Sequence, residues 1–380
     1  MRSLLHAQAN RRRLTYRLLL ISTATIVTAV MPSAIADAAP RNLLDVALFA
    51  QVPTPGHPEG IAIRPDDNKV FVGTHMDVNG VTTEPSHVFA FNPNGTLDRD
   101  YVIQGQNVNH AGLVGMALDG NGSLYVLDRD PARIIKLDPR TGAQTTYATF
   151  ADVPPCSDTI KKNCSATVQD QPAFPDYLVF APDGTLYVAD ISQALIWRVP
   201  RGGGAAEVWF TSPQLESVFG PNGIQFTDDG HTLMFAQTLH NITDPNDLFK
   251  GHGRLYTLPV QNDGSPGDLK LFWEGVTGEA PDGFAIGRSG KVYVALALGN
   301  ALMALAPDGH ELGRTTATQV QGAQSNQQPA PPFDTPASVA IMDNRALVTN
   351  QAFFGGPADH QVVLDVYIGE NAKPLFLPKF

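Results

Sequence analysis

The sequence lacks the signatures of several large enzyme classes. No Gly-x-Ser-x-Gly elbow, Cys–His signature, His-Glu-x-x-His motif or phosphate-binding loop is apparent, which argues against a covalent nucleophile. The fingerprints of nicotinamide and nucleotide chemistry are missing as well. Basic residues are scarce, with 26 Lys and Arg against 37 Asp and Glu, a formal net charge of −11. Such a surface repels nucleic acid and anionic membranes, so neither is expected as a partner.

Cysteine is almost absent. Cys156 and Cys164 are the 2 cysteines of the chain, and they share a loop that also contains Pro and Lys. No His lies near them in the sequence, which argues against a metal-binding role. In an exported protein a disulfide that closes this loop is expected, whereas two free thiols are expected if the chain stays in the cytoplasm.

The first 36 residues have the pattern of a secretory signal peptide. Four Arg at positions 11–17 form a basic region, residues 18–30 are apolar but too short and Thr-rich for a convincing membrane span, and an Ala-Ile-Ala cleavage motif ends at Ala36. Cleavage there removes five Arg and no acidic residue, which changes the net charge from −11 to −16. A secreted or periplasmic protein without membrane contact is therefore expected, with an uncleaved anchor as the alternative.

What the sequence does contain is turn residues, 34 Gly and 30 Pro, and one phrase that occurs six times. In the copy at residues 220–236, a Gly-Pro-Asn-Gly entry leads through a short apolar strand and an Asp-Gly turn into a second strand. Asp-Gly between apolar runs is a strong hairpin signal. Alignment of the copies places one residue of each in register, 55, 62, 46, 60 and 55 residues apart: Glu59, Val114, Asp176, Asn222, Asp282 and Ala337.

Repeats of this length, with a third and a fourth strand after each hairpin, predict propeller blades. We expect an all-β protein in which residues 37–380 form one six-bladed β-propeller with four-stranded blades. The apolar run at residues 43–50 precedes the first repeat and has no blade of its own. It is expected to complete the final blade as its outer strand and so close the ring, and residues 374–378 are expected to add an edge contact.

The aligned residues begin the innermost strand of each blade, so in a closed ring they converge on the central axis. Four of the six carry side-chain oxygen atoms, an arrangement typical of a hard-cation site: Glu59, Asp176, Asn222 and Asp282. The oxygen-only set favours one Ca²⁺, with Mg²⁺, Mn²⁺ and Zn²⁺ left open. The alternative is that each residue is only a turn or cap residue. Val114 and Ala337 at the same register show that the turn does not require a polar residue.

Other polar residues follow second strands or precede blade entries, where their side chains can reach the mouth of the ring. The candidates for substrate contacts are His75, His110, Asp128, Asp190, Gln237, His240 and Asn350. For Asp128 and Asp190 the alternative is hydrogen bonding to the adjacent backbone, and for His110 a polar surface position.

Three stretches interrupt the blades, at residues 152–173, 238–253 and 320–333. Long loops in compact folds are usually functional or mobile. The first ends directly before the entry to Asp176 and is expected to lie over the mouth, tethered by the disulfide. The third is expected either at the mouth or as a solvated insertion.

Three motifs, together with the hairpin phrases, resemble the senescence marker protein/gluconolactonase/luciferin-regenerating enzyme family of six-bladed propellers. They are the entries His-Pro-Glu-Gly at 57–60, Gly-Pro-Asn-Gly at 220–223 and Ala-Pro-Asp-Gly at 280–283. The resemblance covers the whole mature chain. It implies one axial divalent cation, lactone hydrolysis, and Glu59, Asn222 and Asp282 as metal ligands. Asp176 stands where the family usually has Asn in a Pro-Asn-Asp motif, which makes it either a fourth ligand or the general base.

The expected function is a secreted metal-dependent hydrolase that opens a lactone, or a related small-molecule ester, without an acyl-enzyme. Asp176 and Asp282 are assigned as its catalytic residues. Two alternatives remain open: a non-catalytic propeller that binds a ligand or protein and has a structural cation, and a phosphotriester hydrolase at the same site. The sequence does not indicate the acyl portion, the ring size or the oligomeric state.

Overall fold

The computed structural model describes residues 41–167, 169, 171–227, 230–316 and 330–380. These residues form 25 strands and three short 3₁₀ helices: η1 (Pro213–Leu215), η2 (Pro245–Lys250) and η3 (Ala358–His360). None of the helices in this part of the chain has the length and apolar character needed to cross a membrane. The expected signal peptide, the residues 228–229 of one hairpin turn and most of the stretch 320–333 lie outside the described residues.

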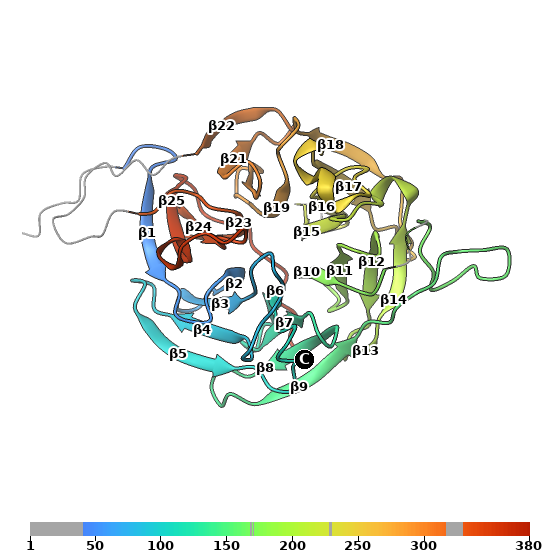
Figure 1. Cartoon of the computed structure of the whole chain (residues 1–380), viewed down its shortest axis with the longest axis horizontal. Coiled ribbons are helices and arrows are strands. Elements are labelled where there is room, and N and C mark those ends of the chain that lie inside the picture. Colours follow the sequence, from blue (N-terminus) through green and yellow to red (C-terminus); the bar gives the residue numbers. More distant parts are fainter. Residues whose placement is uncertain (1–40, 168, 170, 228–229, 317–329) are drawn as a thin grey trace, which may run out of the picture. The chain divides into compact units, whose positions relative to one another are not determined.

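Six sheets follow one another around a ring, each built from four antiparallel strands, which confirms the expected all-β six-bladed propeller (Figure 1). The first three blades, from inner to outer strand, are β2 (Pro58–Arg64), β3 (Lys69–Thr74), β4 (His87–Phe91), β5 (Leu97–Val102); β6 (Leu113–Leu118), β7 (Leu124–Asp128), β8 (Arg133–Leu137), β9 (Gln144–Thr149); and β10 (Pro175–Phe180), β11 (Leu186–Asp190), β12 (Leu195–Val199), β14 (Glu207–Thr211). The two-residue strand β13 (Gly204–Ala205) pairs in parallel with β9.

The remaining blades follow the same plan. They are β15 (Pro221–Phe226), β16 (Thr232–Gln237), β17 (Arg254–Pro259), β18 (Lys270–Glu274); β19 (Pro281–Ile286), β20 (Val292–Leu296), β21 (Ala301–Leu305), β22 (Glu311–Thr315); and β23 (Pro336–Met342), β24 (Arg345–Asn350), β25 (Val362–Tyr367), β1 (Val46–Gln51). The last blade therefore takes its outer strand from the beginning of the described chain, and β1 pairs antiparallel with β25.

The hydrophobic core lies between blades rather than within them. One cluster packs Tyr125 and Leu127 of the second blade against Phe180 and Trp197 of the third. The indole of Trp197 is fully buried and donates its one hydrogen bond to Asp190, 2.9 Å away. Because each blade buries its faces against its neighbours, no blade is expected to be stable by itself.

Residues 370–380, called here the C-terminal strap, contact the hairpin turns on the side opposite the strand entries. The Glu370 carboxylate accepts hydrogen bonds from Ser289 in the fifth blade, and the ammonium of Lys373 donates to the Phe226 carbonyl in the fourth. The Phe376 ring packs edge-on against the Phe226 ring, 5.8 Å between centroids. The strap thus connects several blades rather than adding only an edge contact.

The disulfide between Cys156 and Cys164 is confirmed, with 4.9 Å between the two Cα atoms. The expectation that its loop covers the mouth is wrong. The Asn163 side chain accepts a hydrogen bond from the backbone of Val208, and the Thr211 hydroxyl accepts one from the backbone of residue 166, so the loop packs on the outer strand β14. In Figure 1 it projects from the outside of the ring. The reason is the topology: the stretch leads from the outer strand β9 to the inner strand β10, and its middle lies at the rim.

Candidate functional site

Each innermost strand is interrupted at its entry by a β-bulge. The register between the first two strands shifts around the aligned residue in every blade, for example between Pro58 and Ile61 and between Pro221 and Ile224. A bulge leaves a residue unpaired and redirects its side chain. At the bulge, the side chain of the aligned residue therefore does not follow the alternating directions of side chains along the strand. It faces the axis instead.

A glycine follows the aligned residue in four of the six blades, and its missing side chain brings neighbouring strands together. A Cβ atom added at Gly60 would lie 2.1 Å from the Val114 carbonyl oxygen, and one at Gly223 would lie 2.5 Å from the Asp282 carbonyl oxygen. Each contact is made with the aligned residue of the next blade. Glycine at these positions permits the close approach that lets the side chains converge.

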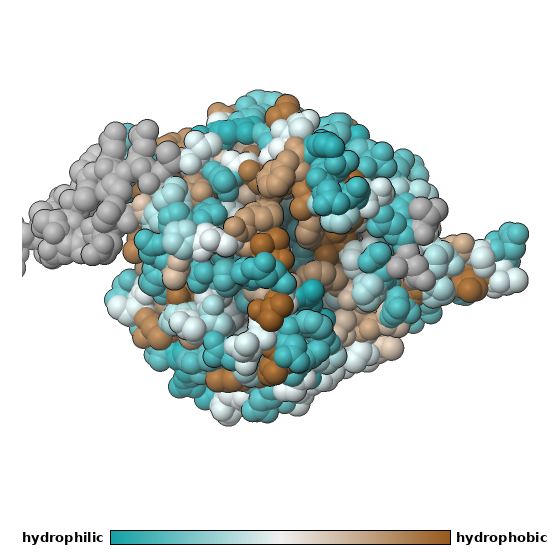
Figure 2. Space-filling view, viewed as in Figure 1, coloured by the Kyte–Doolittle hydropathy of each residue, from teal (hydrophilic) through white to brown (hydrophobic). Residues whose placement is uncertain are grey.

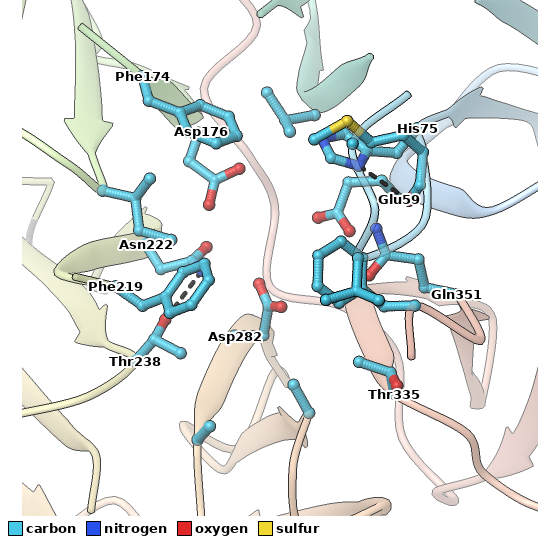
Figure 3. A pocket seen from close by; sticks show the side chains of 18 of the residues that line it. Glu59, His75, Phe174, Asp176, Phe219, Asn222, Thr238, Asp282, Thr335 and Gln351 are labelled. Carbon is cyan, nitrogen blue, oxygen red and sulfur yellow. Dashed lines mark hydrogen bonds between the residues drawn. The ribbon is translucent and has the colours of Figure 1, made fainter. Parts of the chain in front are cut away.

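A cavity of about 500 Å³ opens at this end of the ring, and all four oxygen-bearing aligned residues line it. The space-filling view shows the hollow near the centre of the molecule (Figure 2). In Figure 3 the side chains of Glu59, Asp176, Asn222 and Asp282 point toward a common centre. The exposed fractions of Glu59, Asp176 and Asn222 are 4%, 5% and 2%. The alignment of the repeats therefore located one buried polar group.

The carboxylates of this group repel one another. Burial raises the pKa of Glu59 well above its ordinary value, and the charges of Asp282 and Asp176 raise it further. The pKa of Asp282 is raised by burial and then by Asp176. Burial and the charge of Asp190 raise the pKa of Asp176 to about 7. At neutral pH the group therefore favours bound protons or a bound cation.

Two oxygen atoms of the group have no hydrogen-bond partner. The Asn222 amide nitrogen donates to the Thr238 hydroxyl at 2.9 Å, which orients the amide. The Oδ1 atoms of Asn222 and Asp282 are buried and accept no hydrogen bond. Unpartnered buried oxygens beside carboxylates fit a hard cation. Within the described residues, no group of three or more His, Cys, Asp or Glu is placed to hold a metal ion by itself.

His75 and His110 line the same cavity. The His75 ring lies 6.4 Å from each of the Phe174 and Phe353 rings, and its Nδ1 is 3.3 Å from the Met76 carbonyl. Burial, with a contribution from Arg129, lowers the pKa of His75 to about 3, so its imidazole is neutral. His110 is exposed and lies 3.2 Å from an Asp130 carboxylate oxygen.

The other candidates for substrate contacts do not line the cavity: Asp128, Asp190, Gln237, His240 and Asn350. Asp190 accepts hydrogen bonds from the backbone of Phe174 and Gln193, and Asp128 accepts them from the side chains of Gln106 and Arg133. Gln237 and Asn350 donate to backbone carbonyls, and His240 packs near His252. A direct substrate contact for these five stays a prediction.

Sequence reasoning missed most of the cavity wall. Arg129, Phe174, Phe219, Phe353 and Phe354 line the cavity, and all of them lie in loops just before an innermost strand or just after a second strand. The one feature of the sequence that could have identified these residues is their position next to the repeated strands. Different residue types form the wall in each blade, so alignment of the repeats does not reveal a recurring wall residue.

Comparisons with known proteins agree with the resemblance seen in the motifs. The sequence model of the SMP-30/gluconolactonase/LRE-like region matches residues 211–322. No curated protein sequence matches the chain.

Several solved structures share the fold. Regucalcin from Agrobacterium tumefaciens, described as a calcium-binding protein, has a TM-score of 0.60 at 16% identity, over 89% of this chain and 98% of its own. A gluconolactonase from Xanthomonas campestris has a TM-score of 0.53 at 16% identity, over 88% and 99%. A luciferin-regenerating enzyme has a TM-score of 0.58 at 12% identity, over 89% and 100%. The resemblance is thus confirmed: the chain contains an SMP-30/gluconolactonase/LRE-like region at residues 211–322, within a propeller fold that these proteins share.

Proposed function

We propose that this protein is a metal-dependent hydrolase that opens lactones or related esters at the axial site, and that it belongs to the family whose region it contains. The observation that carries the proposal is the buried oxygen-only group at the base of the cavity, with the Oδ1 atoms of Asn222 and Asp282 unpartnered. Both residues lie within the matched region. The calcium-binding description of regucalcin and the gluconolactonase from Xanthomonas campestris support it.

The proposed cation is Ca²⁺, with Mg²⁺, Mn²⁺ and Zn²⁺ as alternatives, held by Glu59, Asp176, Asn222 and Asp282. When bound, it supplies Lewis-acid polarisation of the scissile carbonyl. Thr238 keeps the Asn222 oxygen turned toward the site through the hydrogen bond to the amide nitrogen. The Tyr177 hydroxyl, one residue after Asp176, bonds to the Ser338 hydroxyl, one residue after Ala337, and so connects the third blade to the sixth.

In the proposed reaction the Asp176 carboxylate takes a proton from the attacking water as that water adds to the carbonyl carbon. The tetrahedral adduct then collapses, the ring C–O bond breaks, and Asp176 returns the proton to the leaving alkoxide. Asp282 shares in orienting the water from the other side of the group. The lining of the cavity contains no Ser or Cys among the described residues, which agrees with direct hydrolysis. The disulfide favours export to an oxidising compartment such as the periplasm.

The test is elemental analysis of the purified protein combined with a panel of lactones, aryl esters and a phosphotriester. We expect about one cation per chain and lactone turnover, both reduced in Asp282→Asn. The matched control is Asp268→Asn, which changes an exposed carboxylate outside the cavity and should leave both unaltered. If the cation-loaded protein hydrolyses none of the esters, the enzyme proposal is wrong.

A further inference from the structure

The wall of the cavity above the axial group is mainly apolar. Phe174 and Phe219 are seen beside the axial residues in Figure 3, and Leu239, Leu298 and Phe353 also line the cavity. Two polar side chains of the wall already have protein partners. The Asn79 amide donates to Asp77 at 2.9 Å, and the His110 ring contacts Asp130. The other neutral polar side chains of the lining, on His75, Thr238, Thr335 and Gln351, are few beside its apolar surface, so a polyhydroxylated lactone would leave several hydroxyl groups facing apolar side chains.

The wall contains one cation, Arg129, in the loop that follows β7. Its guanidinium lies 5.2 Å from the centre of the Phe174 ring, and one of its nitrogens donates to the Met76 sulfur. Burial lowers the pKa of Arg129 while Asp130 raises it, but an arginine with a modestly lowered pKa stays protonated at neutral pH. The side chain is therefore a half-buried positive charge on the cavity surface.

Within the described residues, the other half-buried arginines donate hydrogen bonds to oxygen atoms of the protein. The Arg129 side chain has no such oxygen acceptor among these residues. Arg133, four residues later, donates to the Asp128 carboxylate at 2.9 Å. The charge nearest to Arg129, Asp130, instead accepts hydrogen bonds from Asn107 and His110. In the part of the chain that the structure describes, the Arg129 guanidinium donates its one side-chain hydrogen bond to a thioether and lies over an aromatic ring, and Asp130 acts on it through its charge without a hydrogen bond. Its planar N–H groups remain available for a carboxylate, which they match in a bidentate fashion.

The entrance to the cavity is apolar as well. Phe354 after β24 lines the cavity and is 40% exposed, and its ring lies 5.9 Å from that of Phe249 of η2, which is 64% exposed and follows the lining residue Leu248. Val78, another exposed residue of the lining, is tied to the same loop by its backbone hydrogen bond to Phe353. Figure 2 shows hydrophobic residues gathered around the central hollow. Exposed apolar groups at a cavity entrance favour an apolar ligand.

We infer that the substrate of the axial site is a lactone or ester with an aryl or alkyl body and one anionic substituent, such as a carboxylate, that binds to Arg129. The inference rests on the proposed hydrolase function. The apolar body packs along Phe174, Phe219 and Phe353, while the scissile carbonyl reaches the axial group. Arg129 is then a specificity residue that distinguishes charged from uncharged substrates, and a sugar-like polyol lactone is a poor substrate.

The kinetic test compares three lactones on the cation-loaded protein: dihydrocoumarin, a carboxylated dihydrocoumarin and glucono-δ-lactone. The wild type should prefer the carboxylated compound over the uncharged one by about 10- to 100-fold in kcat/KM, the range for a charged hydrogen-bonded pair. Glucono-δ-lactone should be the poorest. Arg129→Gln should lose the preference through KM and keep the rate on dihydrocoumarin within about threefold, since removing one such pair affects only the charged substrate.

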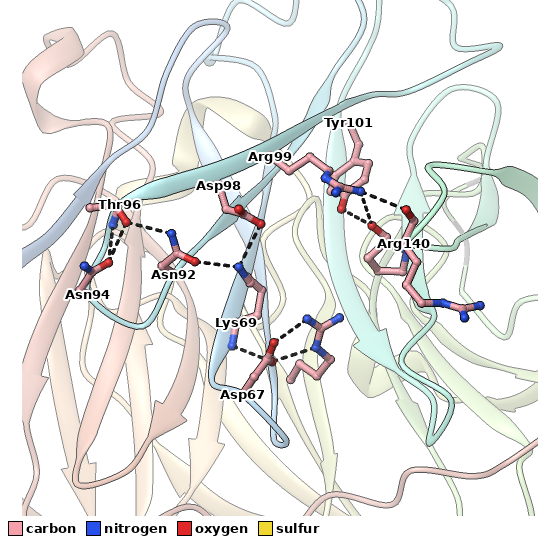
Figure 4. A network of polar contacts seen from close by, with 11 residues as sticks. Asp67, Lys69, Asn92, Asn94, Thr96, Asp98, Arg99, Tyr101 and Arg140 are labelled. Carbon is pink, nitrogen blue, oxygen red and sulfur yellow. Dashed lines mark hydrogen bonds and ion pairs between the residues drawn. The ribbon is translucent and has the colours of Figure 1, made fainter.

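The matched control is Arg99→Gln. Figure 4 shows Arg99 at the outer surface, where it donates to the backbone carbonyls of residues 139 and 140 at 3.0 and 3.1 Å. This variant should keep the preference of the wild type. If Arg129→Gln unfolds, Arg129→Lys retains the charge and should keep part of the preference. Equal losses on all three lactones in a folded Arg129→Gln protein, or a wild-type preference for glucono-δ-lactone, would overturn the inference.

A binding measurement separates this inference from the proposed hydrolysis. Calorimetric titration with 3-phenylpropanoate and with 3-phenylpropan-1-ol uses ligands that cannot be hydrolysed. The wild type should bind the carboxylate at least tenfold more tightly than the alcohol, and Arg129→Gln should bind both alike. Arg129-dependent binding without any ester turnover would refute the hydrolase but support the ligand class. Turnover with no anion preference in either experiment would refute the ligand class alone.

Discussion

Replacing Asp176 by Asn removes a buried carboxylate whose pKa is about 7 in the folded protein, against an ordinary value of 3.8. Because the folded-state pKa lies above the unfolded one, ionisation opposes folding. The cation-free protein keeps its full stability below about pH 4 and loses it as the pH rises through 7. The folded-state and unfolded-state pKa values differ by about three units, and each unit corresponds to about 1.4 kcal/mol. The free energy of unfolding therefore falls by at most about 4 kcal/mol at pH 8. Asn carries no charge, so the Asp176→Asn protein should avoid this loss.

The assay is thermal unfolding of both proteins in EDTA from pH 4 to pH 8. With an unfolding entropy of about 2.1 cal/mol/K per residue over about 340 residues, 4 kcal/mol corresponds to about 6 °C in Tm. The Tm advantage of Asp176→Asn should grow from near zero at pH 4 to about 6 °C at pH 8. Calcium should reduce it, because a bound cation compensates for the burial of the ionised Asp176 carboxylate in the wild type. Parallel pH profiles in EDTA would refute the raised pKa of Asp176.

The same substitution separates the two roles proposed for Asp176. If this residue is the general base, Asp176→Asn should retain the cation and lose about 10²- to 10⁴-fold in turnover. If it is only a ligand, a higher calcium concentration should restore turnover.

Three further predictions concern separate parts of the molecule. Glu59→Gln and Asp282→Asn should lower cation content, measured by elemental analysis, and lactone hydrolysis together. If both variants keep the cation content and the activity of the wild type, these residues are not part of the metal site. Replacing Cys156 and Cys164 by Ser should lower the free energy of unfolding by about 2–3 kcal/mol at most and leave KM unchanged, because their loop packs on β14; thiol titration of the unfolded, unreduced wild type should find no free thiol. Phe376→Ala should lower stability by about 1–3 kcal/mol without changing cation content, since the strap lies opposite the mouth; an unchanged Tm would contradict the role of the strap.

The sequence predicted the fold because the repeated hairpin phrase carries both the strand pattern and the turn. It also predicted which residues share the cavity base, since alignment of the six copies places one residue of each at the same register, where the structure has a β-bulge in every blade. Glu59, Asp176, Asn222 and Asp282 follow from that repetition. Their catalytic and metal-binding roles depend on the experiments above.

The rest depends on contacts that no repeat encodes. Arg129 and Phe174 meet because loops of two different blades pack together, a contact between segments far apart in the sequence. Asp190 lies at the end of a second strand, as a substrate contact would, but five backbone and side-chain donors already bond to its carboxylate oxygens. The disulfide loop connects the outer strand β9 to the inner strand β10, which places its middle at the rim. This position becomes clear only once the order of the strands in the sheets is known.

The proposed function requires that the axial oxygens hold a cation needed for hydrolysis. The most direct test is to remove metal from the purified wild type with a chelator, measure lactone turnover, and then titrate with Ca²⁺. Turnover should disappear with the metal and return as about one cation per chain is bound. Full turnover by the metal-free protein would contradict it.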